Sequence, residues 1–131
     1  VDLAQNFGSR PIQTAEIAGR QGVPEPYLDQ LLTTLRKVGF VKSRRGPNGG
    51  YTLAVEPSDL NLGMVIHALE GPMTPIDCLD GSLECNLAGH CAQQDIWRKV
   101  EAVTTDFLYA TKLIDIVDVQ RQHEQRAMYY I

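Results

Sequence analysis

The chain has 131 residues, 44% of them hydrophobic, which suits one ordinary domain and excludes wholesale disorder. No apolar run reaches the roughly 20 residues of a membrane span and no signal-peptide pattern opens the chain, so a cytoplasmic protein without a membrane partner is expected. The net charge of −4 is unevenly spread: residues 10–51 hold seven Lys and Arg against three Asp and Glu, which favours a phosphate-binding module in this half.

The N-terminal half begins with two short helices. Apolar positions from Val1 to Phe7 have helical spacing and resemble the second half of a helix, so residues upstream of Val1 are expected to be missing. Thr14 is expected to cap a helix through Gln21, and Gly22 to end it. This helix would be the first of a helix-turn-helix.

A second helix is predicted from Pro24 to Val38, with Gly39 as its stop. Its apolar positions recur every three or four residues, which defines one buried face: Leu28, Leu31, Leu32, Leu35 and Val38. The opposite face is free to meet DNA and holds Pro26, Tyr27, Asp29, Gln30, Thr33 and Arg36. There, Gln30 can read an adenine and Asp29 a cytosine amino group; the alternative is a merely solvated surface.

Two predicted strands follow, over residues 40–44 and 51–55, and residues 45–50 between them are rich in Gly, Pro and Asn. A hairpin directly after a helix-turn-helix is a wing. Arg44 and Arg45 gather at its turn, which an ordinary surface hairpin does not explain. We expect Arg45 to enter a minor groove and Lys42 to contact phosphate.

The acidic half starts with a predicted helix over residues 62–70, capped by Asn61 and ended by Gly71 and Pro72. His67 lies off its apolar face and is expected to be a surface or packing histidine rather than a metal ligand.

Residues 72–93 lack periodicity and hold all three cysteines of the chain, Cys78, Cys85 and Cys91. A loop of this length in a small domain is usually functional or disordered, and soft thiolates favour iron-sulfur clusters, zinc or copper(I). The intervals Cys-x6-Cys and Cys-x5-Cys lack the tight pairs of zinc sites and favour a cluster. The alternative, three independently buried thiols, does not suit so polar a loop.

A long amphipathic helix is predicted after this loop, followed by a shorter segment with Leu113, Ile116 and Val117. Its apolar stripe is expected to pair with a second copy in a homodimer that reads two half-sites, or alternatively to pack on its own domain. The positions that recur at spacings of three and four are Trp97, Val100, Val103, Thr104, Phe107 and Thr111.

Four stretches resemble the IscR, NsrR and CymR family of bacterial winged-helix regulators: residues 27–31, 35–41 and 45–51, and the cysteine triad through Trp97. The resemblance spans nearly the whole chain. It implies that Tyr27, Asp29 and Gln30 enter the major groove and Arg45 the minor groove. It also implies that the cysteines hold an iron-sulfur cluster, and that homodimers form through the long helix and repress or activate promoters according to the state of the cluster.

The chain departs from this pattern at two points. The first cysteine interval has six residues where IscR and NsrR have five, and Gln94 stands where IscR has a histidine ligand. The fourth ligand therefore stays open among His90, Asp95, an acidic residue from the N-terminal helix of the other subunit, as in NsrR-like proteins, and a small molecule. Whether the cluster is 2Fe-2S or 4Fe-4S depends on that ligand.

The predicted fold is mainly α with a small β-hairpin wing. A winged helix-turn-helix domain over residues 1–71 is followed by a cluster-binding loop over 72–93 and a dimerisation helix with a C-terminal segment over 94–131. The predicted function is a transcription regulator that binds double-stranded DNA and whose iron-sulfur cluster senses redox state, iron-sulfur status or nitric oxide. The alternative is a zinc-bound or metal-free winged-helix repressor controlled by a small molecule or partner protein. No arrangement of catalytic groups indicates an enzyme.

Overall fold

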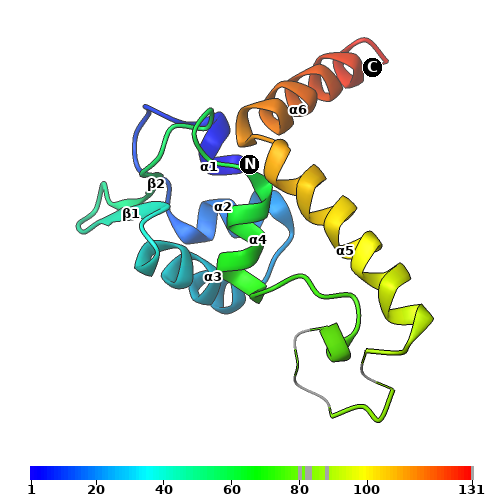
Figure 1. Ribbon diagram of the computed structural model, residues 1–131. Coiled ribbons are helices and arrows are strands. Elements are labelled where there is room, and N and C mark those ends of the chain that lie inside the picture. Colours follow the sequence, from blue (N-terminus) through cyan, green and yellow to red (C-terminus); the bar gives the residue numbers. More distant parts are fainter. Residues whose placement is uncertain (80, 82–83, 88, 131) are drawn as a thin grey trace.

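The computed structural model describes residues 1–79, 81, 84–87 and 89–130. Its helices and strands are α1 (Asp2–Gln5), α2 (Thr14–Gln21), α3 (Glu25–Lys37), β1 (Val41–Arg44), β2 (Gly50–Leu53), α4 (Leu62–Glu70), the 3-10 turn η1 (Asp77–Leu79), α5 (Ala92–Ala110) and α6 (Leu113–Met128) (Figure 1). Helices dominate and the two strands form one antiparallel hairpin, which confirms the predicted fold class. In the described residues, no helix is long and apolar enough to cross a membrane.

The helix-turn-helix consists of α2 and α3, which pack against each other. Gly22 ends α2 in the left-handed region at φ 63°, as predicted, because glycine has no Cβ to oppose that conformation. The predicted cap was wrong by one residue: α2 begins at Thr14, and Gln13 occupies the N-cap without a side-chain capping hydrogen bond.

Helix α3 turns its apolar face inward over most of the predicted length. Leu32 is buried, and Leu28, Leu31 and Leu35 are half-buried. Val38 was placed on this face wrongly: it is 48% exposed, because it follows the last helical residue, just before the chain turns at Gly39. The outer face of α3 stays open.

The hairpin is joined to the helical body at its base. Val41 pairs with Leu53 and Arg44 with Gly50, so the wing is short and its connection spans residues 45–49. On its other edge, Tyr51 exchanges two backbone hydrogen bonds with Ile12, of 2.8 and 2.9 Å. Strand β2 is therefore held on both sides, which fixes the direction of the wing.

One core joins the N-terminal and C-terminal parts of the chain. Its buried cluster comprises Ala4, Val41, Leu53, Leu60, Leu113 and Val117. The first two turns of α6 thus complete the core beneath the wing. Near the far end of α6, Glu124 accepts hydrogen bonds from Gln120 and from Gln5 of α1, and these bonds lower the pKa of its carboxyl group.

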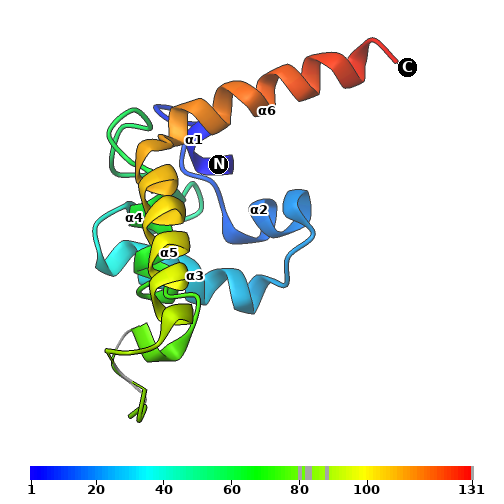
Figure 2. The same cartoon turned by 45° about the vertical axis from the view of Figure 1, so that its right-hand side comes forward.

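Helices α4 and α5 pack together as a hairpin whose connection holds the cysteines (Figures 1 and 2). Asn61 caps α4 as predicted, because its Oδ1 accepts a 2.8 Å hydrogen bond from the Met64 N–H. Helix α5 starts at Ala92, two residues inside the predicted loop, and α6 has 16 residues where only a shorter segment was expected.

Candidate functional site

The outer face of α3 and the wing form one exposed surface, which we call the reading face. It holds all seven residues predicted to bind DNA, each of them exposed: Tyr27, Asp29, Gln30, Arg36, Lys42, Arg44 and Arg45. The Arg36 guanidinium donates a 3.3 Å hydrogen bond from Nη1 to Ser43 Oγ of β1. This bond links the last turn of α3 to the wing.

Hydrogen bonds within α3 distinguish the side chains that are free to read bases. The Thr33 hydroxyl donates to the Asp29 carbonyl at 2.7 Å, and the Thr34 hydroxyl to the Gln30 carbonyl at 3.1 Å. Both hydroxyl protons are thereby used inside the helix. Tyr27, near the start of α3, is 55% exposed and presents its ring outward. Tyr27, Asp29 and Gln30, the residues predicted to enter the major groove, thus lie in the N-terminal half of α3.

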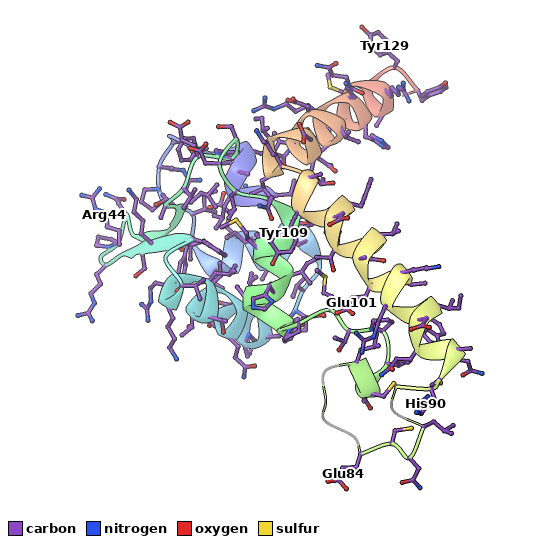
Figure 3. The ribbon with its side chains drawn as sticks, viewed as in Figure 1. Arg44, Glu84, His90, Glu101, Tyr109 and Tyr129 are labelled. Atoms are coloured by element: carbon purple, nitrogen blue, oxygen red, sulfur yellow. The ribbon has the colours of Figure 1, made fainter. Side chains whose placement is uncertain are left out.

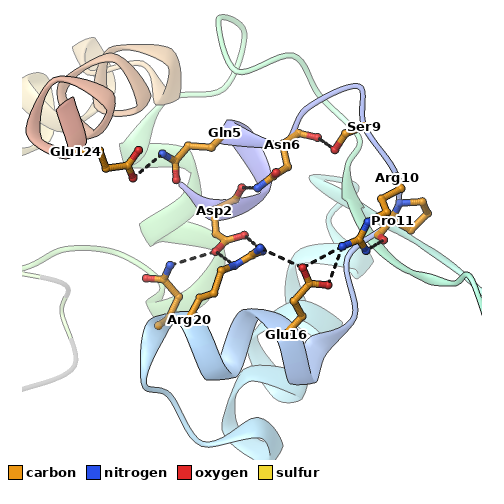
Figure 4. Close-up of polar contacts among 10 residues, drawn as sticks. Asp2, Gln5, Asn6, Ser9, Arg10, Pro11, Glu16, Arg20 and Glu124 are labelled. Atoms are coloured by element: carbon orange, nitrogen blue, oxygen red, sulfur yellow. Dashed lines mark hydrogen bonds and ion pairs between the residues drawn. The ribbon is translucent and has the colours of Figure 1, made fainter. Parts of the chain in front are cut away.

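The cations of the basic half fall into two groups. Arg10 and Arg20 are neutralised: Arg10 pairs with Glu16 at 3.0 Å, and Arg20 pairs with Asp2 at 2.7 Å and with Glu16 at 3.1 Å (Figure 4). Within the described part of the chain, the other five have no carboxylate partner: Arg36 and Lys37 in the last turn of α3, and Lys42, Arg44 and Arg45 on the wing. The unbalanced positive charge thus lies on the wing and on the end of α3 that contacts it, where phosphate contacts are expected.

The wing turn requires glycine at its base. Gly50 has a φ of 146°, and a Cβ there would lie 2.9 Å from the Gln13 nitrogen and still closer to the Ile12 carbonyl group. The Gln13 side chain also donates a 3.4 Å hydrogen bond to the Pro47 carbonyl at the tip of the wing. Gln13 is a contact that the sequence analysis missed, because no pattern connects residues 34 positions apart.

The three cysteines lie at the far end of the α4–α5 hairpin as free thiols (Figure 3). Cys78 is half-buried in η1, Cys85 is exposed, and Cys91 is half-buried at the N-cap of α5, where its side chain makes no capping bond. Among the residues that the structure describes, no three or more His, Cys, Asp or Glu side chains are placed to hold a metal ion. The proposed ligands share one segment but are not gathered into a site.

The candidates for a fourth ligand lie around Cys91. An open cavity of about 410 Å³ at the start of α5 is lined by His90, Cys91, Gln94 and Asp95, together with Arg98. His90 is exposed, and Asp95 lies in the first turn of the helix. The positions of His90 and Asp95 leave both residues as candidates for the fourth ligand and favour neither.

Helix α5 has an exposed apolar stripe, consisting of Ile96 (58% exposed), Val100 (42%), Val103 (70%) and Phe107 (70%). At 100° per residue these four positions fall within an arc of about 60°. Val100, Val103 and Phe107 were predicted from the sequence, but the start of the stripe was assigned to Trp97, which is 38% exposed. None of the α5 residues is buried, whereas Leu113 and Val117 of the following segment are in the core. The expected stripe is therefore open in α5 only.

Comparisons with known proteins agree on one family. The Rrf2 family, iron-dependent transcriptional regulators, matches residues 1–119. The transcriptional regulator CymR of Bacillus subtilis is 32% identical over the whole chain and 90% of its own length. Its solved structure, titled as that of the global cysteine regulator, matches with a TM-score of 0.77 at 33% identity, over 90% of this chain and 86% of that one.

Two IscR proteins match as well. IscR of Vibrio atlanticus is 37% identical over 82% of this chain, which spans 62% of that regulator's length. The structure of T. potens IscR matches with a TM-score of 0.74 at 40% identity, over 91% of this chain and 77% of that one. These relatives are transcriptional regulators, and none of their names denotes an enzyme.

Proposed function

The chain belongs to the Rrf2 family of transcriptional regulators, and from this premise we propose that it binds promoter DNA as a homodimer whose affinity is controlled by an iron-sulfur cluster on Cys78, Cys85 and Cys91. One observation carries the proposal. The cysteine segment, residues 72–91, connects α4 to α5. Helix α4 packs on α3, the proposed recognition helix, and α5 carries the open apolar stripe. A change at the cysteines therefore acts on both elements that a dimeric DNA reader needs.

DNA reading is assigned to the reading face. We propose that Tyr27, Asp29 and Gln30 contact base edges in the major groove, while Arg45 enters the adjacent minor groove. Lys42 and Arg44 would neutralise phosphates on either side. The absence of carboxylate partners for the wing cations in the described residues supports these roles, since an unpaired cation needs to break no ion pair on meeting DNA.

Homodimerisation is assigned to the α5 stripe. Four large apolar side chains on one narrow arc favour burial against a second helix of the same kind in a two-fold contact. Fully burying an exposed side chain of this size stabilises by roughly 1.5–3 kcal/mol. Since these four are 42–70% exposed, each gains about half of that from a partner helix.

Charged substitutions test the dimer directly. Val103→Glu places a carboxylate at the centre of the stripe, and sedimentation equilibrium should then show a monomer, because an unpaired charge cannot be buried in an apolar contact. Val119→Glu on α6, where the wild-type side chain is 51% exposed but off the stripe, is the matched control and should remain dimeric. If Val103→Glu is still a dimer, the dimer contact lies outside the α5 stripe.

The donor set of the cysteine segment fits an iron-sulfur cluster by its chemistry. Three free, accessible thiols within one connection are soft ligands, and apart from η1 the described residues between them have no helix or strand to hold them apart. Loading a cluster requires the three sulfurs to be drawn together. The N-terminus of the 19-residue helix α5 at Cys91 favours the negative charge that a thiolate-bound cluster carries. When bound, the cluster supplies a redox-active centre.

We propose that coupling between the cysteines and DNA passes through the packed helices. A cluster held by Cys78 and Cys91 would tie the start of α5 to η1, which α5 already contacts. Helix α4, at the other end of the same connection, packs on α3. Coupling of about 1–3 kcal/mol between cluster and DNA changes affinity roughly 5- to 150-fold, which is sufficient for regulation.

The first test is an anaerobic absorbance spectrum with iron and sulfide assays on the purified protein. We expect a brown protein that contains iron and sulfide in equal amounts. Cys85→Ala should lose the iron and the sulfide, whereas Asn86→Ala, which changes an exposed neighbour without a thiol, should keep them. His90→Ala then tests the fourth ligand, with His67→Ala, on the exposed face of α4, as its control. Colourless protein after cluster reconstitution would reject the cluster.

DNA affinity completes the test. Operator binding by cluster-loaded and cluster-stripped protein should differ at least about fivefold, and Cys85→Ala should bind like the stripped form. If the affinities of loaded, stripped and Cys85→Ala protein are equal, the cysteines do not control DNA binding.

A second candidate is a regulator without a cluster, zinc-bound or metal-free, controlled by a small molecule or a partner protein. The observation in its favour is the full-length match to CymR, together with thiols that are not gathered into a metal site in the described residues. Zinc without sulfide, or DNA affinity that is insensitive to metal, would support this candidate.

A further inference from the structure

A contact between Gly63 and Tyr109 has no role in the DNA reading or cluster binding described above. Gly63 is the second residue of α4 and is buried, while Tyr109 lies near the end of α5 (Figure 3). A Cβ at position 63 would lie 2.6 Å from Tyr109 Cε2 and 2.7 Å from Cγ, so the ring lies directly against the Gly63 backbone. Any side chain larger than hydrogen at this position would displace the ring.

Backbone hydrogen bonds surround this contact. The Leu62 N–H donates to the Thr111 carbonyl, and the Leu113 N–H donates to the Leu60 carbonyl, both at 2.8 Å. The N-terminus of α4 and the junction between α5 and α6 are thereby held together. We call these two bonds and the Gly63–Tyr109 contact the α4–α5 joint.

The α4–α5 joint determines the direction of α5. Tyr109 points to the opposite side of α5 from the stripe, since it follows Phe107 by two residues, or about 200° around the helix. One side of α5 is therefore seated on α4, and the other presents the stripe. Because α4 packs on the recognition helix α3, the tilt of α5 on Gly63 sets the direction of the stripe relative to the reading face.

We propose that Tyr109, seated on Gly63, is a positioning residue that fixes the separation of the two reading faces and so selects the spacing of operator half-sites. This inference rests on the proposed homodimer, in which two α5 stripes meet. A small change in the tilt of α5 is then doubled by the two-fold axis. Half-sites of dimeric helix-turn-helix proteins lie one helical turn or a multiple apart, so such a change alters the preferred spacing.

Three substitutions separate positioning from stability. Gly63→Ala displaces the ring but keeps a helical backbone, and Tyr109→Ala removes the ring. In the double variant, the alanine methyl occupies space that the ring has left. Gly19→Ala is the matched control, because Gly19 also lies in a helix and a Cβ there meets nothing within 4 Å. Tyr109→Phe retains the ring and should behave as the wild type.

The measurement is affinity for duplexes whose two half-sites are separated by a varied number of base pairs, alongside affinity for a single half-site. Wild type, Gly19→Ala and Tyr109→Phe should prefer one spacing. Gly63→Ala and Tyr109→Ala should bind a single half-site as the wild type does, but lose at least about fivefold of the discrimination between spacings. The double variant should unfold at a higher temperature than Gly63→Ala without regaining the discrimination, because the ring is still absent.

The outcomes are distinct. A dimeric wild type with a preferred spacing that Gly63→Ala and Tyr109→Ala both retain would overturn the positioning role and leave the proposed function intact. If Gly63→Ala folds poorly but Tyr109→Ala does not, the spacing preference of Tyr109→Ala alone tests the positioning role. A monomeric wild type would overturn the proposed dimer and this inference together, whereas a dimeric wild type without any preferred spacing would overturn this inference alone.

Discussion

The reading face and the cysteine segment are built in opposite ways. Beneath the reading face lie buried side chains from four parts of the chain, and its wing is held along both edges of β2. The cysteine segment contributes no buried residue among those described between Pro72 and Cys91. Its only described regular element is the three-residue turn η1. One region is held by its own packing, whereas the described residues of the other contribute no buried side chain to hold it.

This difference fits the proposed division of labour. DNA reading needs side chains held in register with the grooves, so rigid elements carry them. A sensor needs an element whose equilibrium a ligand can shift, and such elements come from the less stable parts of a fold. Substitutions at packed positions should therefore lower stability, whereas substitutions at exposed positions of the cysteine segment should change it little.

The largest change in the free energy of unfolding is expected when a buried leucine is compared with an exposed one. Leu60 is 1% exposed and Leu87, in the cysteine segment, is 60% exposed. Leu60→Ala should lower the free energy of unfolding by about 2–5 kcal/mol through lost burial and a cavity, while Leu87→Ala should change it by less than about 0.5 kcal/mol. Urea denaturation followed by circular dichroism measures both. Equal losses would mean that the cysteine segment is packed as firmly as the core.

A second test concerns the base of the wing. Gly50→Ala combines a left-handed φ with a clash against the Ile12 backbone, and should destabilise by roughly 2–4 kcal/mol. Gly46→Ala has a φ of 108° but meets nothing within 4 Å, and should cost about 1–2 kcal/mol. Thermal unfolding ranks the two variants. If Gly46→Ala were the worse, backbone strain alone would control the wing.

The third test separates the two groups of arginines. Arg45→Ala should weaken operator binding about 10- to 100-fold, or roughly 1–3 kcal/mol, with a smaller loss on random DNA. Arg10→Ala, whose guanidinium already pairs with Glu16, should change affinity less than about twofold. Fluorescence anisotropy at several salt concentrations measures both. Equal losses for Arg45→Ala on operator and random DNA would reduce Arg45 to a phosphate contact.

The sequence predicted most of the fold because its local signals agree with one another. Asn61 and Gly71 bound α4 at the predicted residues, and the wing strands differ from prediction by two residues at most at any end. Thr14 was misplaced because Thr is a favoured cap, yet here it takes the first helical position. The helix ends set by glycine were predicted best, since a positive φ leaves few alternatives.

What the sequence could not supply was the partner of each apolar residue. Leu113, Ile116 and Val117 were expected only in a shorter segment after the long helix, with no partner assigned, whereas Leu113 and Val117 are buried in the core. The Tyr109 ring packs on Gly63, which lies 46 positions away in the sequence, and periodicity gives no signal for such a contact. The roles of the cysteines and of the reading face stay predictions, because they depend on a cluster and a duplex.

The smallest expected effect concerns the cap of α4. Asn61→Ala removes the acceptor for the Met64 N–H and should lower the free energy of unfolding by about 1 kcal/mol. Gln13→Ala, at the start of α2, removes no capping bond and only the exposed 3.4 Å hydrogen bond to the Pro47 carbonyl, so it should cost less than about 0.5 kcal/mol. Because α4 lies between the recognition helix and the cysteine segment, Asn61→Ala should also narrow the affinity difference between cluster-loaded and stripped protein. If stability falls while that difference stays unchanged, the coupling runs through α5 rather than through α4.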